Sequence, residues 1–136
     1  MTQATTQSSA RSVLLVDDND INVMVASEFL SGINIHPDIA VDGQDAIDKL
    51  NQEGSDYALI LMDCQMPIMD GYQATKLIRE GKAGEKYKHA KIIAVTANAL
   101  SSDRQKCLDA GMDDYISKPL KVGSFTELVN SYLDPE

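Results

Sequence analysis

Leu59-Ile60-Leu61-Met62-Asp63 is the stretch that decides the fold, because four apolar residues stand together and a carboxylate follows them directly. The run Val13–Val16, of sequence Val-Leu-Leu-Val, has the same character and leads into Asp17. Neither run alternates with polar residues, which indicates strands whose two faces are both buried. Such strands are typical of a parallel sheet that carries helices on both sides. The two runs therefore predict an α/β protein built on a parallel sheet.

Strand-like and helix-like stretches alternate through the rest of the chain. We expect strands at about residues 12–17, 35–40, 57–62, 91–95 and 114–117. We expect helices at about residues 20–31, 43–53, 71–81, 98–110 and 122–133. Five βα units in series predict a doubly wound α/β fold, with a five-stranded parallel sheet and five helices. In such folds, ligands bind at the carboxyl ends of the strands.

Residues near the predicted helix ends support these bounds. Gly54 and Gly111 come just after helical stretches, where a residue in the left-handed conformation often ends a helix. Asp70 and Ser124 each stand three residues before a Gln or Glu, a spacing typical of capping boxes at helix starts. The polar segment 81–89 predicts a loop.

Composition limits the function classes. The 136 residues suffice for one domain, and residues 1–10 predict a disordered leader or linker ahead of a domain at 11–136. The formal net charge of -9 argues against direct binding to nucleic acid, which needs a basic face. No apolar run is long enough to span a membrane, so we expect no membrane contact by this domain. Cys64 and Cys107 lack metal-ligand spacing, and we expect reduced thiols rather than a disulfide.

Reactive side chains follow four of the predicted strands. They are Asp17 and Asp18 after the first, Asp63 after the third, Thr96 after the fourth and Lys118 after the fifth. Parallel strands bring these groups to one edge of the sheet. Clustered carboxylates repel one another unless a cation neutralises them, and Mg2+ suits carboxylate, water and phosphate oxygens. A carboxylate can also attack phosphorus while cations and hydroxyls stabilise the transferred oxygens. The set predicts a magnesium-dependent phosphoryl-acceptor site.

Each of these side chains also has a simpler interpretation. Asp17 and Asp18 suit the cap of a following helix, since Asp is a favoured capping residue. Thr96 is an ordinary β-branched strand residue, and Lys118 is an ordinary surface lysine. Their coincidence at equivalent strand ends favours the phosphoryl-acceptor interpretation.

Four segments carry a resemblance to a known family. They are 14–19 (Leu-Leu-Val-Asp-Asp-Asn), 59–71 (Leu-Ile-Leu-Met-Asp-Cys-Gln-Met-Pro-Ile-Met-Asp-Gly), 92–99 (Ile-Ile-Ala-Val-Thr-Ala-Asn-Ala) and 110–119 (Ala-Gly-Met-Asp-Asp-Tyr-Ile-Ser-Lys-Pro). Over roughly residues 11–133 the chain resembles a response-regulator receiver domain of two-component signalling. The resemblance implies a flavodoxin-like fold with strand order 2-1-3-4-5.

The resemblance also assigns metal and acceptor roles to individual positions. Asp63 is the expected phosphoacceptor. Mg2+ is expected on Asp18, on Asp63 and on the backbone carbonyl of Gln65. Asp17 is expected to assist through a water molecule.

Four further positions match the family pattern at the ends of the last two strands. Lys118 and Thr96 are expected to act with the acceptor in catalysis, because they match the invariant lysine and the conserved hydroxyl position of the family. The bond from Lys118 to Pro119 is expected to be cis. Thr96 and Tyr115 match the family's switch pair.

The helix expected after Asp18 carries two apolar stripes. They are Val23, Ala26 and Leu30, and Ile21, Val25 and Phe29. One stripe must cover the sheet, and the other is surplus apolar surface beside the site. In the family this helix docks the histidine-bearing partner, so partner contacts are expected at Ile21, Val25, Phe29 and Pro119. Burial of the second stripe under a loop is the alternative.

The quoted segments resemble most the receivers of hybrid sensor kinases, which lie C-terminal to a kinase core. The expected partner is then the dimerisation and phosphotransfer domain of a histidine kinase, or a histidine phosphotransfer protein. The domain would take a phosphoryl group from a phosphohistidine, catalyse its own phosphorylation and dephosphorylation, and switch conformation or relay the group onward. A cytoplasmic location follows, including as the cytoplasmic part of a membrane-anchored kinase.

Three alternatives stay open. A stand-alone single-domain regulator would share this chemistry and act on a downstream protein. A magnesium-dependent phosphatase with an aspartyl nucleophile needs a general acid, commonly an Asp two residues further on, where this chain has Gln65. A flavodoxin-type electron carrier needs a phosphate-binding loop after the first strand, where Asp17 and Asp18 would repel phosphate.

Overall fold

A computed structural model describes residues 12–66, 68–97 and 101–133. The predicted leader at 1–10 and the first residues of the helix predicted at 98–110 lie outside the described residues. Side chains are described for all of these ranges except residues 101–103.

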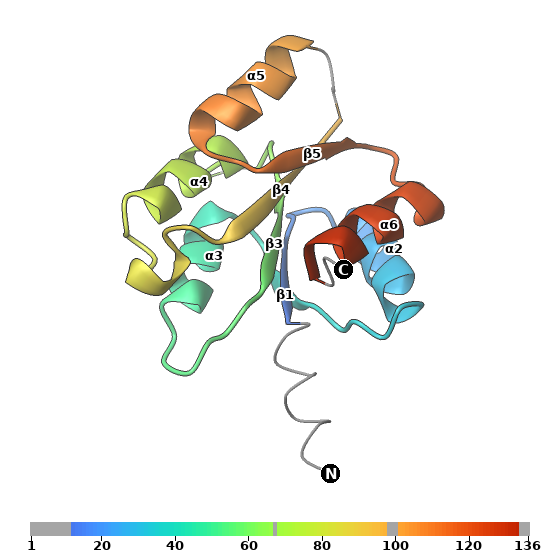
Figure 1. The fold of residues 1–136 in the computed structure, drawn as a ribbon, viewed down its shortest axis with the longest axis horizontal. Coiled ribbons are helices and arrows are strands. Elements are labelled where there is room, and N and C mark those ends of the chain that lie inside the picture. Colours follow the sequence, from blue (N-terminus) through green and yellow to red (C-terminus); the bar gives the residue numbers. More distant parts are fainter. Residues whose placement is uncertain (1–11, 67, 98–100, 134–136) are drawn as a thin grey trace.

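The described chain forms a five-stranded parallel sheet with helices on both faces (Figure 1). The strands are β1 (Val13–Val16), β2 (Asp38–Ala40), β3 (Leu59–Asp63), β4 (Lys91–Thr96) and β5 (Asp114–Ser117). The helices are α2 (Asp20–Ser31), α3 (Gly43–Leu50), α4 (Gly71–Arg79), α5 (Ser101–Ala110) and α6 (Val122–Leu133), with a 3-10 helix η1 (Glu85–Tyr87). The strand order β2-β1-β3-β4-β5 confirms the predicted flavodoxin-like arrangement.

Two hydrophobic layers hold the helices on the sheet. In β1, Leu14 and Val16 pack into the layer under α3, α4 and α5, while Val13 and Leu15 pack into the layer under α2 and α6. Figure 1 shows these two sets of helices on opposite sides of the sheet. Alternate residues of a strand point to opposite faces, so an unbroken apolar run supplies both layers at once. This confirms the interpretation of the non-alternating runs.

Two strand starts differ from the prediction. β3 begins at Leu59 rather than near residue 57. β2 begins at Asp38 rather than near residue 35. Pro37 lacks an N–H group and cannot donate to a neighbouring strand, which delays the ladder. Ile35 is nevertheless buried in the layer under α2 and α6. The segment predicted as a loop at 81–89 contains the short helix η1.

The helix starts agree with the prediction better than the helix ends, because α3 ends at Leu50 rather than near residue 53 and α4 ends at Arg79 rather than near residue 81. Asp70 caps α4, because its Oδ1 accepts the Gln73 N–H at 2.9 Å. The expected cap at Ser124 is wrong, since α6 already begins at Val122. Gly111 directly follows α5 and has the expected left-handed conformation (φ 105°). Gly54 is also left-handed (φ 86°), but it does not cap α3, which ends at Leu50 with Asn51 as its C-cap.

Gly71 allows α4 to begin against the end of β3. Its N–H donates to the Cys64 carbonyl at 3.1 Å. A Cβ atom at this position would collide with the carbonyl oxygen of Asp63. Glycine is therefore required for the helix to lie this close to the last residue of β3.

Arg79 ties the end of α4 to the segments on either side of β4. Its guanidinium donates to the carbonyl oxygens of Gly111 at 2.6 and 2.8 Å, Ala90 at 2.8 Å and Lys88 at 3.1 Å. It also pairs with the Asp113 carboxylate at 3.1 Å. The planar fork of arginine satisfies several carbonyls at once. This network fixes the turn that leads into β5.

Replacing Arg79 should destabilise the fold. In Arg79→Lys, the ammonium lacks the fork geometry and leaves carbonyls without donors, so we expect the free energy of unfolding to fall by about 2 kcal/mol. Lys76→Ala changes an exposed residue on the same helix and should change stability by less than about 0.5 kcal/mol. Chemical denaturation measures both, and equal stabilities for wild type and Arg79→Lys would contradict the role of the network.

Candidate functional site

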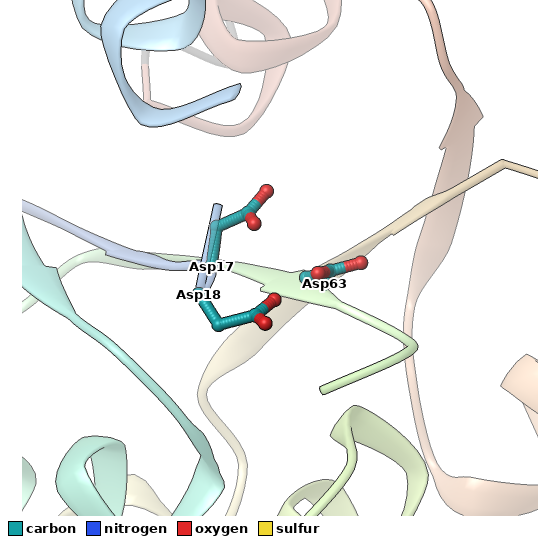
Figure 2. Close-up of side chains that lie close together, drawn as sticks. All are labelled: Asp17, Asp18 and Asp63. Carbon is teal, nitrogen blue, oxygen red and sulfur yellow. The ribbon is translucent and has the colours of Figure 1, made fainter. Parts of the chain in front are cut away.

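Three carboxylates meet at the carboxyl ends of two neighbouring strands (Figure 2). Asp17 and Asp18 follow β1, and Asp63 ends β3. The two strands pair in parallel with Val16 opposite Met62, so the residues that follow lie side by side. One oxygen from each carboxylate lies within 4.8 Å of the others. Asp17 and Asp63 are buried, whereas Asp18 is exposed.

A neighbouring asparagine, rather than these carboxylates, caps the helix that follows. The Asn19 side chain accepts the Ile21 N–H at 2.9 Å and the Asn22 N–H at 3.0 Å. Asp17 Oδ1 accepts the Asn19 N–H at 3.0 Å, which orients the loop. The simpler interpretation of Asp17 and Asp18 as helix caps is therefore wrong, because Asn19 already satisfies the first turn of α2.

Lys118 brings a positive charge into the carboxylate cluster. Its Nζ lies 3.2 Å from Asp63 Oδ1 and 3.6 Å from Asp17 Oδ2. Its backbone N–H donates to the Thr96 carbonyl at 2.7 Å, which joins the end of β5 to the end of β4. The bond from Lys118 to Pro119 is cis, as the resemblance implied. The predicted groups from three strands are thus in direct contact.

Burial shapes the acidity of Asp63. Loss of water raises its pKa from 3.8 to about 6, and the Asp17 charge adds to the rise while Lys118 opposes it. Between these values the folded state binds more protons at this group than the unfolded chain, so its contribution to stability is lost as pH rises through about 6. At neutral pH the site holds buried negative charge that Lys118 balances only in part. Hard oxygen donors under such repulsion fit a divalent cation of the Mg2+ type.

Thr96 and Tyr115 lie on adjacent strands. β4 and β5 pair with Ala94 opposite Tyr115 and Thr96 opposite Ser117, so the two side chains project from the same face of the sheet. Thr96 is buried, and Tyr115 is half-buried. The Arg104 guanidinium of α5 lies 5.2 Å from the centre of the Tyr115 ring. The tyrosine is therefore placed between the site edge and α5.

Gln65 follows the cluster in the loop after β3. Its N–H donates to Asp63 Oδ1 at 3.4 Å, and its side chain is exposed. The Lys118 ammonium contacts the same oxygen, so both donors engage one side of the carboxylate. Gln65 thus lies beside the cluster, as expected from its position in the sequence.

A groove of about 240 Å³ opens beside the cluster between α2 and α6. Its lining includes Asp17, Ile21, Val25, Lys118, Pro119 and Leu120. Ile21 is 65% exposed, and Val25 is half-buried. Phe29, the third residue of the apolar stripe that begins with Ile21 and Val25, has a different environment. Its ring centre lies 6.1 Å from that of Phe125 on α6. Sequence reasoning missed Leu120, although an apolar residue directly after Lys-Pro is a signal that could have identified it.

Two cysteines meet under α5, which the sequence did not predict. Cys64 directly follows Asp63, and its Sγ lies 3.9 Å from Cys107 Sγ. Both residues are buried, and they form no disulfide. Burial, with a smaller effect of Cys107, raises the pKa of Cys64 to about 12. No local pattern in the sequence reports this contact.

No helix within the described ranges is both long and apolar enough to cross a membrane.

Comparison with known sequences gives relatives among histidine kinases. Hybrid signal transduction histidine kinase L of Dictyostelium discoideum is 44% identical over 121 residues, which cover 88% of this chain and 7% of that protein. Histidine kinase 1 of Arabidopsis thaliana is 37% identical over 139 residues, which cover 79% of this chain and 11% of that protein. The chain thus matches a small part of these relatives.

Solved structures show the same fold. The receiver domain of the sensor histidine kinase PA1611 from Pseudomonas aeruginosa, with a magnesium ion coordinated in its active-site cleft, has a TM-score of 0.80 and 38% identity over 90% of this chain and 97% of that one. The Saccharomyces cerevisiae co-crystal of the phosphotransfer protein Ypd1 with the Ssk1 receiver domain has a TM-score of 0.78 and 30% identity over 89% of this chain and 87% of that one.

The sequence model of the response regulator receiver domain family matches residues 13–130. This range includes all five strands of the described sheet and the three carboxylates of the site. This match agrees with the strand order and with the cluster around Asp63 and Lys118. The chain therefore belongs to the response regulator receiver domain family.

Proposed function

We propose that this chain accepts a phosphoryl group on Asp63 from a phosphohistidine, as one step of a phosphorelay. The observation that carries the proposal is the ammonium of Lys118, 3.2 Å from Asp63 Oδ1 inside a carboxylate cluster. A carboxylate that accepts a phosphoryl group needs a positive charge held close to it, which stabilises the negative phosphoryl oxygens during transfer. The histidine kinase relatives and the receiver crystallised with a phosphotransfer protein support the same class of reaction.

The transfer requires few groups. A carboxylate oxygen of Asp63 attacks phosphorus, the bond from phosphorus to the donor imidazole nitrogen breaks, and its electron pair stays on that nitrogen. Lys118 stabilises one phosphoryl oxygen, and the Thr96 hydroxyl donates to another. Burial of Asp63 limits the water around the nucleophile. Catalysis is then mostly positioning and charge stabilisation, which rigid strand ends suit.

Mg2+ is the cofactor we propose for this site. Asp18, Asp63 and the backbone carbonyl of Gln65 would hold it, and Asp17 would assist through water. Bound Mg2+ supplies positive charge for the transferred oxygens. Support comes from the oxygens gathered within 4.8 Å and from the related receiver that was crystallised with magnesium.

We also propose that phosphorylation acts on Thr96 and Tyr115. The new phosphoryl oxygens would attract the Thr96 hydroxyl, which vacates space that the Tyr115 ring can enter. A ligand shifts a conformational equilibrium only by its differential contacts with the two states, and this hydrogen bond is such a contact. The Arg104 guanidinium over the Tyr115 ring would transmit the change to α5.

The partner we propose is a helix bundle that carries the histidine, either in a kinase or in a phosphotransfer protein. The groove lined by Ile21, Val25 and Pro119 opens beside Asp17 and Lys118, so a helix seated there reaches the acceptor. Because the Phe29 ring packs towards α6, we propose a smaller role in docking for Phe29 than for Ile21 and Val25. The hybrid-kinase relatives favour a parent kinase chain, and a stand-alone regulator is the second candidate. The unbridged cysteines favour the cytoplasm as the location.

Asp63→Asn should abolish phosphorylation. Incubation with Mg2+ and a small phosphodonor should add one phosphoryl group to wild type, and the variant amide cannot act as the nucleophile. Asp48→Asn, at an exposed position on α3, should be labelled like wild type. Intact-mass measurement distinguishes these results, and undiminished labelling of Asp63→Asn would refute the assignment.

Asp18→Ala should weaken Mg2+ binding at least about tenfold, because a direct carboxylate ligand is lost. Asp20→Ala removes an exposed acid two positions away and should change the affinity little. Titration calorimetry with MgCl2 gives both dissociation constants. Equal affinities in Asp18→Ala and wild type would contradict the proposed ligand set.

Thr96→Val should be phosphorylated but should respond less, since valine keeps the shape of threonine and lacks its hydroxyl. Thr75→Val removes another buried threonine hydroxyl, on α4, and should leave the response intact. Amide chemical shifts with and without a beryllofluoride mimic report the response. A full response of α5 and β5 in Thr96→Val would exclude the proposed coupling.

Val25→Glu should slow transfer from a phosphohistidine protein by about tenfold or more, because it places a charge in the groove. A small phosphodonor needs no interface and should react as with wild type. Leu108→Glu, at an exposed position on α5, is the matched control. If Val25→Glu folds and slows both donors equally, or neither, α2 is not the docking surface.

A further inference from the structure

We propose that Cys64 and Cys107 are an oxidation site, at which hydrogen peroxide produces an intramolecular disulfide that fastens α5 to the end of β3. The chain contains two cysteines, so one internal disulfide is possible. The formation of this bond does not depend on phosphorylation, and it adds a modification site to the receiver.

The geometry already pairs the two sulfurs. Cys64 Sγ and Cys107 Sγ lie 3.9 Å apart although 43 positions separate them in the chain. Each residue is 1% exposed, so the pair is enclosed. A disulfide has an S–S length of about 2.05 Å, so the proposed bond requires the sulfurs to approach by roughly 2 Å through side-chain rotation and a shift of α5.

One partner of the pair is firmly held. The Cys64 N–H donates to the Val95 carbonyl at 3.0 Å, and the Cys64 carbonyl accepts the Gly71 N–H at 3.1 Å. These bonds fix the cysteine between the ends of β3 and β4 and the first residue of α4. Cys64 therefore provides a rigid anchor next to Asp63.

The other partner lies on α5. Among the described side chains of α5, the buried ones are Cys107 and Ala110. The exposed ones are Arg104, Gln105, Lys106, Leu108 and Asp109. Surface elements of a fold open locally at a lower free energy than its core strands, and the proposal requires such an opening of α5. Opening of α5 admits peroxide to the thiols, and closure returns the sulfurs to contact.

The chemistry balances with hydrogen peroxide as the oxidant. On opening, the Cys107 thiolate attacks one peroxide oxygen, the O–O bond breaks, and a sulfenic acid and one water form. On closure, the Cys64 sulfur attacks the sulfenic sulfur, the S–O bond breaks, and a second water leaves. Two electrons pass from the sulfurs to peroxide, and the two thiol protons end in water. A dithiol reductant reverses the change.

The bond would restrain α5 in its packed position. It would join the residue directly after Asp63 to the helix whose Arg104 covers the Tyr115 ring. In the oxidised protein the local opening of α5 is blocked, so its amides should exchange with solvent at least about tenfold more slowly. Blocking of a phosphorylation response in α5 would follow as well, and this consequence alone rests on the proposed function.

Peptide mapping and hydrogen exchange test the proposal. The chain is treated with hydrogen peroxide, alkylated and digested without reductant. We expect a linked peptide pair that contains Cys64 and Cys107, a mass loss of two hydrogens and slower exchange in α5, all reversed by dithiothreitol. Exposed Met24 gains oxygen instead of losing hydrogen, so mass separates its oxidation from the disulfide.

Cys107→Ala and Cys64→Ala serve as matched controls, and both should lose the peroxide effect on α5. Bridges between two chains, over-oxidised cysteines without a bridge, or a bridge with unchanged exchange in α5 would each overturn the proposal. Mapping of the wild-type chain is decisive even if a variant fails to fold. Labelling of Asp63 by a small phosphodonor is measured on the reduced chain, so failure of the phosphoacceptor proposal is seen separately.

Discussion

The rest of the site depends on one constraint, which is that like charges are held together at the end of two buried parallel strands. Asp17 and Asp63 lose most of their contact with water, and their mutual repulsion adds to that cost. Lys118, which follows β5, opposes the repulsion, yet the pKa of Asp63 stays near 6. The negative charge of such a site is only partly neutralised, and a bound cation would neutralise more of it. The packed core supplies the free energy that keeps the charges in place.

The core can hold the site because its anchors are rigid. β3 is buried along its whole length and pairs with β1 and β4, so Asp63 is held by ladders on both sides. Gly71 lets α4 begin against that strand end, and Arg79 ties the other end of α4 to the turn before β5. Lys118 follows β5, and its Nζ lies 3.2 Å from Asp63 Oδ1. Positions of catalytic groups at the ends of strands vary little when the strands are locked in this way.

Helices on both faces surround this frame. α5 lies close to the site through its Arg104, whose guanidinium lies 5.2 Å from the centre of the Tyr115 ring. The groove between α2 and α6 lies on the opposite face from α5. The docking surface and the response that we propose would therefore use separate faces of the sheet that share the strand ends. The contact between Cys64 and Cys107 joins the end of β3 to α5.

The sequence by itself determined the features that depend on near neighbours along the chain. Unbroken apolar runs identified the buried strands, Asp70 identified a helix start, and strand ends located Asp63, Thr96 and Lys118 at one edge. Other features depended on packing between distant elements, including whether two residues of one apolar stripe are exposed or covered. Ile21 and Phe29 share a stripe, but α6 packs against the second and leaves the first exposed. The contact of Cys64 with Cys107 and the raised pKa of Asp63 also came from packing. The physical reason is that periodicity reports the direction of a side chain from its own element, whereas burial and electrostatic potential sum over every element that packs around it.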